Sequence, residues 1–329
     1  MEKRILSGIK PSGDLNIGGY GGALSQFVKL QHDYQCYFFI PDLHAVTVPQ
    51  PPEVLRRRTM DIAALYIAAG IDPRKSPIFL QSQVPAHAEL GYLLQTVAVM
   101  GELGRMTQYK EKSEGQASVS SALFTYPVLM AADVLLYRST HVPVGDDQLQ
   151  HLELARDLAR RFNQRFGVEL FPAPEPIVQT IGSRIKGLDN PAAKMSKSNP
   201  NPNSCVMLMD EPDLIRRKFA KAVTDSEGLV RYDWERKPAV SNLIEIYEVF
   251  SGLSVEQIER RYEGSGYGLF KGELAEVVIG KLEPLQERYR AWIGTPELDA
   301  VLAEGAERAA AAAAPVIERA KQAMGFVRF

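Results

Sequence analysis

The chain has 329 residues, 45% of them hydrophobic, and a formal net charge of −2. This length can bury a large core and suggests one large domain with a smaller one, while the near balance of charge excludes a uniformly basic surface. The apolar runs are shorter than a membrane helix needs, and the basic N-terminus lacks the apolar stretch of a secretory signal. The two cysteines, Cys36 and Cys205, are far apart. We therefore predict a cytoplasmic protein without a membrane partner, a disulfide framework or a metal held by its own side chains.

Short apolar runs alternate with helical patterns along the first half of the chain. The runs that we interpret as strands are 4–9, 36–40, 78–80 and 142–144. The helical patterns are 23–30, a helix that Pro51 and Pro52 open and Gly70 closes, 90–97, and about 147–166. This alternation predicts an α/β fold with a Rossmann-like parallel sheet and helices on both faces, whose ligands bind at the carboxyl ends of the strands.

The second half of the chain has a different pattern. Prolines interrupt the alternation at 171–176, and after a short apolar run at 206–209 the pattern is helical up to an alanine-rich stretch at 309–314. We place a domain boundary near residue 190. The expected division is a catalytic domain over 1–189 and a smaller, all-helical domain over 190–294, with a C-terminal helix at about 295–329 that can pack back on the first domain.

A glycine-rich turn follows the first predicted strand. Gly18 and Gly19 are followed closely by a second glycine pair, and together they open a helix. Glycine lets the backbone approach a bound group, and a helix N-terminus offers free N–H donors and a partial positive charge. The turn suits a nucleotide, although its spacing is not the GxGxxG of dinucleotide-binding proteins. The alternative is a tight turn that only allows close helix packing.

A second motif, Lys194-Met-Ser-Lys-Ser198, stands before an Asn-Pro-Asn-Pro-Asn stretch. Two lysines and two serines on a turn-rich loop can close over a polyphosphate, because lysine supplies charge and serine supplies hydrogen-bond donors. Taken alone, the motif also fits an ordinary surface loop. Its occurrence together with the glycine-rich turn favours the phosphate-binding interpretation.

These motifs resemble those of a known family. KMSKS is the second signature of class I aminoacyl-tRNA synthetases, and Asn16-Ile-Gly-Gly19 stands where they carry the HIGH signature. Further segments resemble bacterial tryptophanyl-tRNA synthetases, so that the resemblance covers nearly the whole chain: DxHAxTV from Asp42, QSxVPAH from Gln81, GELxRMTQxKEKS from Gly101, TYPVLMAADVLLY from Thr125, VPVGxDQxQHxEL from Val142 and AVTDSEG from Ala222. Four positions depart from the family pattern without removing a residue that the chemistry requires: Lys10, Gly19, Leu43 and Asp146.

The resemblance implies a ligase that activates L-tryptophan with ATP, releases pyrophosphate and transfers the tryptophanyl group to tRNA(Trp). The tryptophan carboxylate attacks the α-phosphate and needs no general base, because it is already an anion. Catalysis then consists of alignment and stabilisation of charge on the phosphates. The family further implies a homodimer, Mg²⁺ carried by the ATP phosphates, and anticodon binding by the helical domain.

The resemblance also assigns the site residues. Those expected to hold the departing pyrophosphate are Lys112, Lys194 and Lys197. Those expected at the rest of the ATP are Lys10, Pro11 and Ser12 on the α-phosphate side, Gly18 and Gly19 under the nucleotide, Gly145, Asp146 and Asp147 at the ribose, Ile185 at the adenine, and Met195, Ser196 and Ser198 of the KMSKS loop.

The expected tryptophan pocket is centred on Asp133, which lies in an otherwise apolar helical segment. A carboxylate there is costly unless it is paired. It is either a structural cap or ion pair, or it accepts the indole N–H, which can only donate. In the second case we expect the empty pocket to leave Asp133 open to water. Tyr126 and Gln148 are expected to hold the substrate ammonium, and the expected walls are His44, Met130, Val142 and Val144.

Three other functions share some of these features. A tyrosyl-tRNA synthetase has the same fold and both signatures. A binding module descended from a synthetase would keep the fold and lose phosphate-gripping residues, whereas this chain keeps both KMSKS lysines. A small-molecule nucleotidyltransferase has a HIGH-like turn but does not need a helical C-terminal third. The basic runs at 56–58, 156–165 and 216–221 are either polyanion-binding patches or ordinary solvated helix faces.

Overall fold

The structure is a computed structural model that describes residues 3–115, 118–145, 148–178, 185–197 and 199–327. The chain forms two compact units. The first unit contains the described residues up to Ser12, Lys29–Val178 and the described residues from Ile293 onward. The second unit contains Gly13–Val28 and the described residues from Ile185 to Trp292. The glycine-rich turn belongs to the second unit, and the long central segment of the first unit ends at Val178, before the expected boundary near residue 190.

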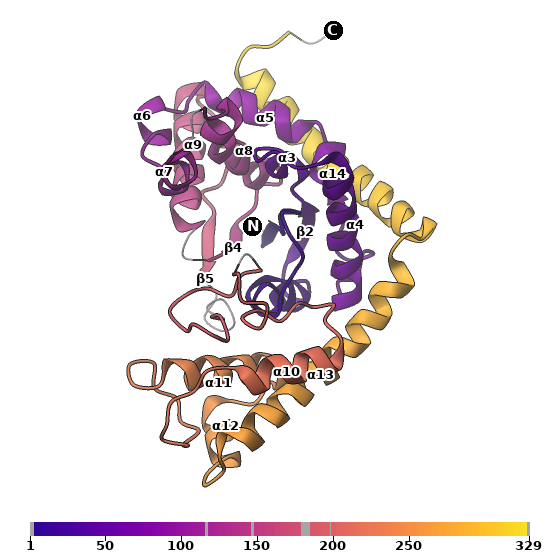
Figure 1. Ribbon diagram of the computed structural model, residues 1–329. Coiled ribbons are helices and arrows are strands. Elements are labelled where there is room, and N and C mark those ends of the chain that lie inside the picture. Colours follow the sequence, from indigo (N-terminus) through magenta and orange to yellow (C-terminus); the bar gives the residue numbers. More distant parts are fainter. Residues whose placement is uncertain (1–2, 116–117, 146–147, 179–184, 198, 328–329) are drawn as a thin grey trace. The chain divides into compact units, whose positions relative to one another are not determined.

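The first unit is built on a five-stranded, fully parallel sheet with the strand order β3-β2-β1-β4-β5 (Figure 1). In this sheet Ile5 of β1 pairs with Cys36 of β2 on one side and with His141 of β4 on the other. The order reverses at β1, so the carboxyl ends of β1 and β4 form the crevice in which doubly wound folds bind ligands. The predicted Rossmann-like fold is confirmed. The strands are β1 Arg4–Gly8, β2 Gln35–Ile40, β3 Ile78–Leu80, β4 His141–Val144 and β5 Glu175–Val178.

The fifth strand, β5, was not predicted, because its segment contains prolines that interrupt an apolar pattern. It lies at the edge of the sheet, and Pro176 pairs with Val142 of β4. An edge strand tolerates proline, since one row of its backbone groups needs no ladder partner. Interpretation of the prolines as a break in the alternation was therefore wrong for this strand.

Eight α-helices lie wholly in the described part of the first unit. Helix α4 begins with proline at its first turn and ends at Gly70, whose φ of 113° is left-handed, as the sequence predicted. Within the described ranges no helix is both long and apolar enough to cross a membrane. The helices are α3 Asp42–Ala45, α4 Pro52–Ala69, α5 Ala86–Gln95, α6 Met100–Leu103, α7 Thr107–Ser113, α8 Ser121–Leu136, α9 Leu149–Phe166 and α14 Pro296–Ala323.

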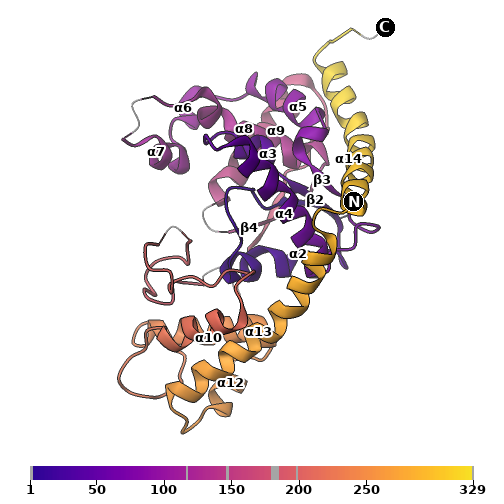
Figure 2. The ribbon, with the colours of Figure 1, turned by 45° about the vertical axis from the view of Figure 1, so that its right-hand side comes forward.

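The C-terminal helix α14 packs on β3, α4 and α5 (Figures 1 and 2). Gly305 lies so close to β3 that a Cβ atom there would overlap the carbonyl oxygen of Ile78. One turn further, the Arg308 guanidinium donates to three successive carbonyl oxygens, those of Pro73 at 2.6 Å, Arg74 at 3.2 Å and Lys75 at 3.4 Å. The absence of a side chain at position 305 therefore permits the close contact between α14 and β3. Arg308 provides hydrogen bonds for the carbonyl groups of the turn before β3.

The second unit is mainly helical, which agrees with the predicted helical domain. Its helices α10 and α11 both pack on α13, and α12 packs on α11 (Figure 1). Buried aromatic rings fill the space between them, with Tyr247 stacked on Phe270 at 6.0 Å and Tyr262 edge-on to Phe270 at 5.0 Å. The elements are α1 Ile17–Gly19, a π-helical turn η1 Tyr20–Leu24, α2 Ser25–Leu30, which runs into the first unit, α10 Pro212–Lys221, α11 Pro238–Ser251, α12 Val255–Arg261 and α13 Tyr267–Trp292.

Candidate active site

A pocket of about 290 Å³ opens at the carboxyl ends of β1 and β4 in the first unit. Gly8 of β1 and Val144 of β4, the last residues of their strands, both line it. Its volume is at the small end of the range for small-molecule sites, roughly 300–1,000 Å³. The structure brings together in its lining all seven residues assigned to the tryptophan pocket, which are His44, Tyr126, Met130, Asp133, Val142, Val144 and Gln148.

The polar end of this pocket is the carboxylate of Asp133 on α8. Its Oδ1 accepts hydrogen bonds from Gln81 Nε2 at 2.7 Å and His87 Nδ1 at 2.6 Å, and its Oδ2 lies 2.7 Å from His44 Nε2. The residue is only 1% exposed. The expectation that the empty pocket leaves Asp133 open to water is therefore wrong, because three side chains of the first unit take the place of that water.

These partners decide the protonation of Asp133. Burial, the largest single influence, raises the pKa of the carboxyl, but the charge and hydrogen bonds of His44 and His87 outweigh it and the net pKa is lowered. Since a carboxylate only accepts, the His87 Nδ1–H donates to it. The other ring nitrogen, Nε2, lies 2.8 Å from the hydroxyl of Tyr137, and burial raises the pKa of this phenol, which keeps it protonated.

The arrangement leaves Asp133 able to bind a ligand. A carboxylate has about four lone-pair positions, and three are used by the side chains described above. Because Asp133 also lines the pocket, the remaining position can accept an N–H group of a ligand. The two interpretations of Asp133, a paired structural carboxylate and a ligand acceptor, are thus compatible in one geometry.

A second polar group lies beside Tyr126. Its hydroxyl lies 3.1 Å from Gln108 Oε1 and 3.0 Å from His151 Nε2, and the same Gln108 oxygen accepts from Lys112 Nζ at 2.9 Å. The Lys112 ammonium also lies 5.2 Å from the centroid of the Tyr126 ring. Gln148, the other residue expected to hold a substrate ammonium, stands directly before α9 and lines the same pocket.

The sequence reasoning missed several residues of these networks, among them Gln81, His87 and Gln108. Gln81 and His87 begin and end the segment QSxVPAH, and Gln108 lies in GELxRMTQxKEKS, so both quoted segments contained them. The sequence showed polar residues inside each segment. It did not indicate which side chains these residues would contact in the folded protein.

Two lysines line the open side of the pocket, Lys10 after β1 and Lys112 on α7. Both also line an adjoining cavity of about 910 Å³, together with Ser12 and Gln148. The pKa of Lys10 is lowered, first by burial and then by the charge of Lys112. Two mutually repelling ammonium groups beside a small-molecule pocket form a site at which a phosphate relieves the repulsion.

The backbone around these lysines is turned tightly. The Ser12 N–H donates to the carbonyl of Lys10 at 2.8 Å, with Pro11 buried between them. After β4, the Gly145 carbonyl accepts from the Gln148 N–H at 2.9 Å. Three residues assigned to the nucleotide, Asp146, Asp147 and Ser198, lie outside the described residues.

The two signature segments contact each other within the second unit. The Asn16 side chain accepts from the Gly19 N–H at 2.9 Å and donates to the carbonyl of Met195 at 3.4 Å. Gly18 faces Ile185, whose Cβ would lie 3.6 Å from a Cβ at position 18. The glycine-rich turn and the KMSKS segment therefore contact each other directly.

Within the KMSKS segment the lysines and the methionine have different environments. Met195 is buried, whereas Lys194 is exposed and its backbone pairs with Lys186. Lys197 Nζ lies 3.9 Å from Asp14 Oδ2, and its side chain occupies the space beside Gly13. The carbonyl of Ser196 accepts from the Asn199 N–H at 3.3 Å.

Members of the basic runs are used in ion pairs. Arg161 makes a bidentate pair with Glu102 at 2.6 and 2.7 Å, Arg216 lies 2.6 Å from Glu276, and the buried Lys218 lies 2.6 Å from Asp210. Among the described residues, no group of three or more His, Cys, Asp and Glu side chains is placed to hold a metal ion. For these basic residues the geometry favours helix-face ion pairs over polyanion binding.

A parallel sheet of this order, with a polar pocket and two lysines at the carboxyl ends of β1 and β4, defines the class of doubly wound α/β proteins. Comparison with known families is more specific. Residues 2–283 match the sequence profile of the family described as tRNA synthetases class I (W and Y), and the chain belongs to this family.

Similar proteins agree with this membership over the full chain. The tryptophan–tRNA ligase of Caldanaerobacter subterraneus subsp. tengcongensis is 56% identical over 325 residues, which are 99% of each chain. That of Bacillus subtilis is 52% identical over 328 residues, which are 100% of this chain and 99% of the relative.

Among solved structures, tryptophanyl-tRNA synthetase from Mycoplasma pneumoniae superimposes with a TM-score of 0.92 at 33% identity, covering 99% of both chains. The enzyme from Campylobacter jejuni, complexed with ADP and tryptophan, has a TM-score of 0.82 at 37% identity and covers 98% of this chain and 100% of that one. The predicted family is thereby confirmed.

Proposed function

We propose that this chain is a tryptophan–tRNA ligase, which forms tryptophanyl-adenylate from L-tryptophan and ATP and then transfers the tryptophanyl group to tRNA(Trp). The observation that carries the proposal is the pocket of the first unit, whose buried Asp133 carboxylate keeps one acceptor position for an N–H donor. Support comes from the similar tryptophan–tRNA ligases and from the similar structure that holds ADP and tryptophan.

In this proposal the indole N–H donates to Asp133. The apolar ring lies against Met130, Val142 and Val144, which line the same pocket, with His44 beside the carboxylate. The substrate ammonium is held by Tyr126 and Gln148. Burying the indole in an apolar pocket stabilises it, and a single charge-assisted hydrogen bond sets its orientation.

In this proposal the nucleotide-binding residues come from several segments of the chain. Lys10, Pro11 and Ser12 lie on the α-phosphate side, Gly18 and Gly19 beneath the nucleotide, and Ile185 at the adenine. Gly145, Asp146 and Asp147 bind the ribose. The three lysines that receive the pyrophosphate are Lys112, Lys194 and Lys197, assisted by Met195, Ser196 and Ser198 of the KMSKS loop. Mg²⁺ is carried by the ATP phosphates and not by a carboxylate cage of the protein.

The first chemical step follows from these positions. The tryptophan carboxylate attacks the α-phosphate in line with the departing pyrophosphate, and the bond between the α- and β-phosphates breaks. No general base is required, because the nucleophile is already ionised. Negative charge grows on the pyrophosphate, and lysine ammonium groups stabilise it as it develops.

The second chemical step and the domain and subunit arrangement rest on the family. A ribose hydroxyl of tRNA(Trp) attacks the carbonyl of the adenylate, loses its proton and forms the ester, and the bond to the phosphate breaks so that AMP leaves. Residues 190–294 form the anticodon-binding domain in this proposal, the catalytic domain is formed by 1–189, and two copies of the chain form a homodimer in the cytoplasm.

Amino-acid-dependent ATP–pyrophosphate exchange tests this function directly. With tryptophan present, the purified chain should transfer label from pyrophosphate into ATP, and with tyrosine or phenylalanine it should do so much more weakly. It should also charge tRNA(Trp). Because a pocket that hydrogen-bonds a substrate N–H leaves its acceptor unpaired with an analogue that lacks the group, discrimination of roughly ten-thousand-fold is within reach. Exchange that prefers tyrosine, or tryptophan binding without exchange, would refute the proposal.

A further inference from the structure

The segment that carries the first KMSKS lysine, 193–195, pairs antiparallel with the segment 185–187 through an isolated β-bridge, and the two paired segments are called the hairpin below. Lys186 pairs with Lys194, the Gly187 N–H donates to the carbonyl of Ala193 at 3.0 Å, and the Met195 N–H donates to the carbonyl of Ile185 at 3.1 Å. The position of Lys194 therefore depends on the segment 185–187, with which it pairs. The contacts that fix segment 185–187 also fix the position of Lys194.

A single buried amide holds segment 185–187. The side chain of Asn242, on α11, accepts from the Lys186 N–H at 2.8 Å and donates to the Lys186 carbonyl at 3.1 Å. Both backbone groups of one residue are thus bonded to one planar amide, which sets the orientation of the strand as well as its distance from the helix. Asn242 is only 1% exposed, so water cannot replace either bond without opening the helix packing.

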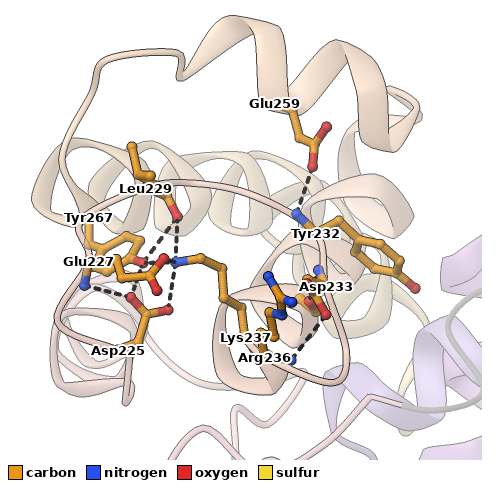
Figure 3. Close-up of polar contacts among 10 residues, drawn as sticks. Asp225, Glu227, Leu229, Tyr232, Asp233, Arg236, Lys237, Glu259 and Tyr267 are labelled. Atoms are coloured by element: carbon orange, nitrogen blue, oxygen red, sulfur yellow. Dashed lines mark hydrogen bonds and ion pairs between the residues drawn. The ribbon is translucent and has the colours of Figure 1, made fainter.

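The helix that carries Asn242 is itself firmly anchored at its start. Lys237, which precedes α11, is buried, and its ammonium lies 2.7 Å from Glu227, 3.1 Å from Asp225 and 3.2 Å from the hydroxyl of Tyr267 (Figure 3). Glu227 and Asp225 lie in the loop after α10, and Tyr267 begins α13. Lys237 therefore ties the start of α11 to two neighbouring elements.

This anchored loop also contacts the hairpin. The Val223 N–H donates to the carbonyl of Leu188 at 2.8 Å, and the Leu188 N–H donates to the carbonyl of Ser204 at 2.9 Å. The hairpin is thus bonded at Leu188 to the loop after α10 and at Lys186 to α11. Lys237 connects this loop to the start of α11.

We infer that Asn242 is a positioning residue for adenylate formation, which aligns Lys194 with the departing pyrophosphate by clamping the paired strand at Lys186. The inference rests on the proposed function and names a residue outside the signature and outside the residues assigned to the substrates. Catalysis by alignment is sensitive to small displacements, and a shift of about 1 Å costs up to roughly 100-fold in rate. Loss of the clamp lets the hairpin move relative to α11 while the lysine itself is retained.

Replacement of Asn242 by leucine removes both hydrogen bonds while keeping the branch at Cγ and the number of side-chain heavy atoms. Asn242→Leu should lower kcat for tryptophan-dependent exchange roughly 10- to 100-fold, with the KM for tryptophan changed less than about twofold. The matched control is Ser241→Ala. Ser241 is the buried neighbour on the same helix, and its hydroxyl accepts from the Asp233 N–H at 2.8 Å without contacting the hairpin. It should exchange at the unaltered rate within about threefold. If Asn242→Leu does not fold, as judged by circular dichroism, Asn242→Ala replaces it.

A double variant separates positioning from general destabilisation. If Asn242 acts through Lys194, adding Asn242→Leu to Lys194→Ala should slow exchange further by less than about threefold, because the aligned group is already gone. Full additivity of the two losses, or equal losses in Asn242→Leu and Ser241→Ala, would overturn the inference and leave the proposed function intact. Absence of tryptophan-dependent exchange in the unaltered chain would instead overturn the proposed function and this inference with it.

Discussion

Replacement of Asp133 by asparagine tests the tryptophan pocket most directly, because the substitution keeps the shape and removes the charge. In the structure all three protein partners of the carboxylate, Gln81, His87 and His44, approach it as possible donors. An amide offers one acceptor oxygen and one NH₂ group. If the oxygen stays with Gln81 and His87, the NH₂ group faces His44 and the ligand, so the indole N–H meets a donor.

The magnitude follows from this geometry. A hydrogen bond to a charged group contributes about 1.5–3 kcal/mol, so tryptophan affinity should fall roughly 10- to 150-fold. A benzothienyl analogue, with sulfur in place of the indole N–H, makes no such bond and should bind both proteins with similar affinity. Stability should also fall, by about 1–3 kcal/mol, because buried donors lose a charged acceptor. This loss of stability is expected because Asp133 is buried and not open to water.

The assay pairs thermal unfolding with exchange rates for tryptophan, tyrosine and phenylalanine. The matched control is Asp157→Asn on α9, whose exposed carboxylate pairs with Arg160 at 2.9 Å. A surface substitution of this kind should change stability by less than about 0.5 kcal/mol and leave selectivity unaltered. An Asp133→Asn variant that melts early but retains full selectivity and full tryptophan affinity would show that Asp133 is only structural, which would refute the reasoning.

Three further outcomes are expected. Lys194→Ala or Lys197→Ala should lower the rate of adenylate formation in single-turnover assays with little change in tryptophan binding, because the charge they stabilise grows toward the transition state; weaker ATP binding at an unchanged rate would contradict this. Gly305→Ala should lower stability by about 1–3 kcal/mol in thermal unfolding, because the new Cβ overlaps a β3 carbonyl oxygen. Gly280→Ala on α13, where a Cβ meets open space, should be neutral or stabilising, and equal effects at the two glycines would refute the packing argument. The net pKa of Asp133 is lowered from 3.8, so its contribution to stability is present above that pH and is lost as pH falls through the lower folded value; Asp133→Asn should show a shallower acid limb in unfolding against pH, and an unchanged limb would count against the lowered pKa.

Much of the fold was predictable from local pattern. The four apolar runs became strands β1 to β4, and Pro52 and Gly70 bounded α4, because fixed φ at proline and left-handed freedom at glycine act on the chain locally. The edge strand β5 was missed because it is short and contains Pro176. What makes it a strand is its pairing with β4, a contact with residues more than thirty positions away in the sequence.

The sequence by itself determined the family, the chemical types of the pocket residues and the presence of both signatures, since these are properties of residue identity and spacing. Only the tertiary structure decided the state of Asp133. Its partners Gln81, His87 and His44 are 52, 46 and 89 positions away in the sequence and meet it only after folding. The clamp of Asn242 on Lys186 spans 56 positions in the same way. Burial and hydrogen-bond partners set the charge and orientation of such groups, and both depend on which distant elements pack together, which local sequence patterns do not encode.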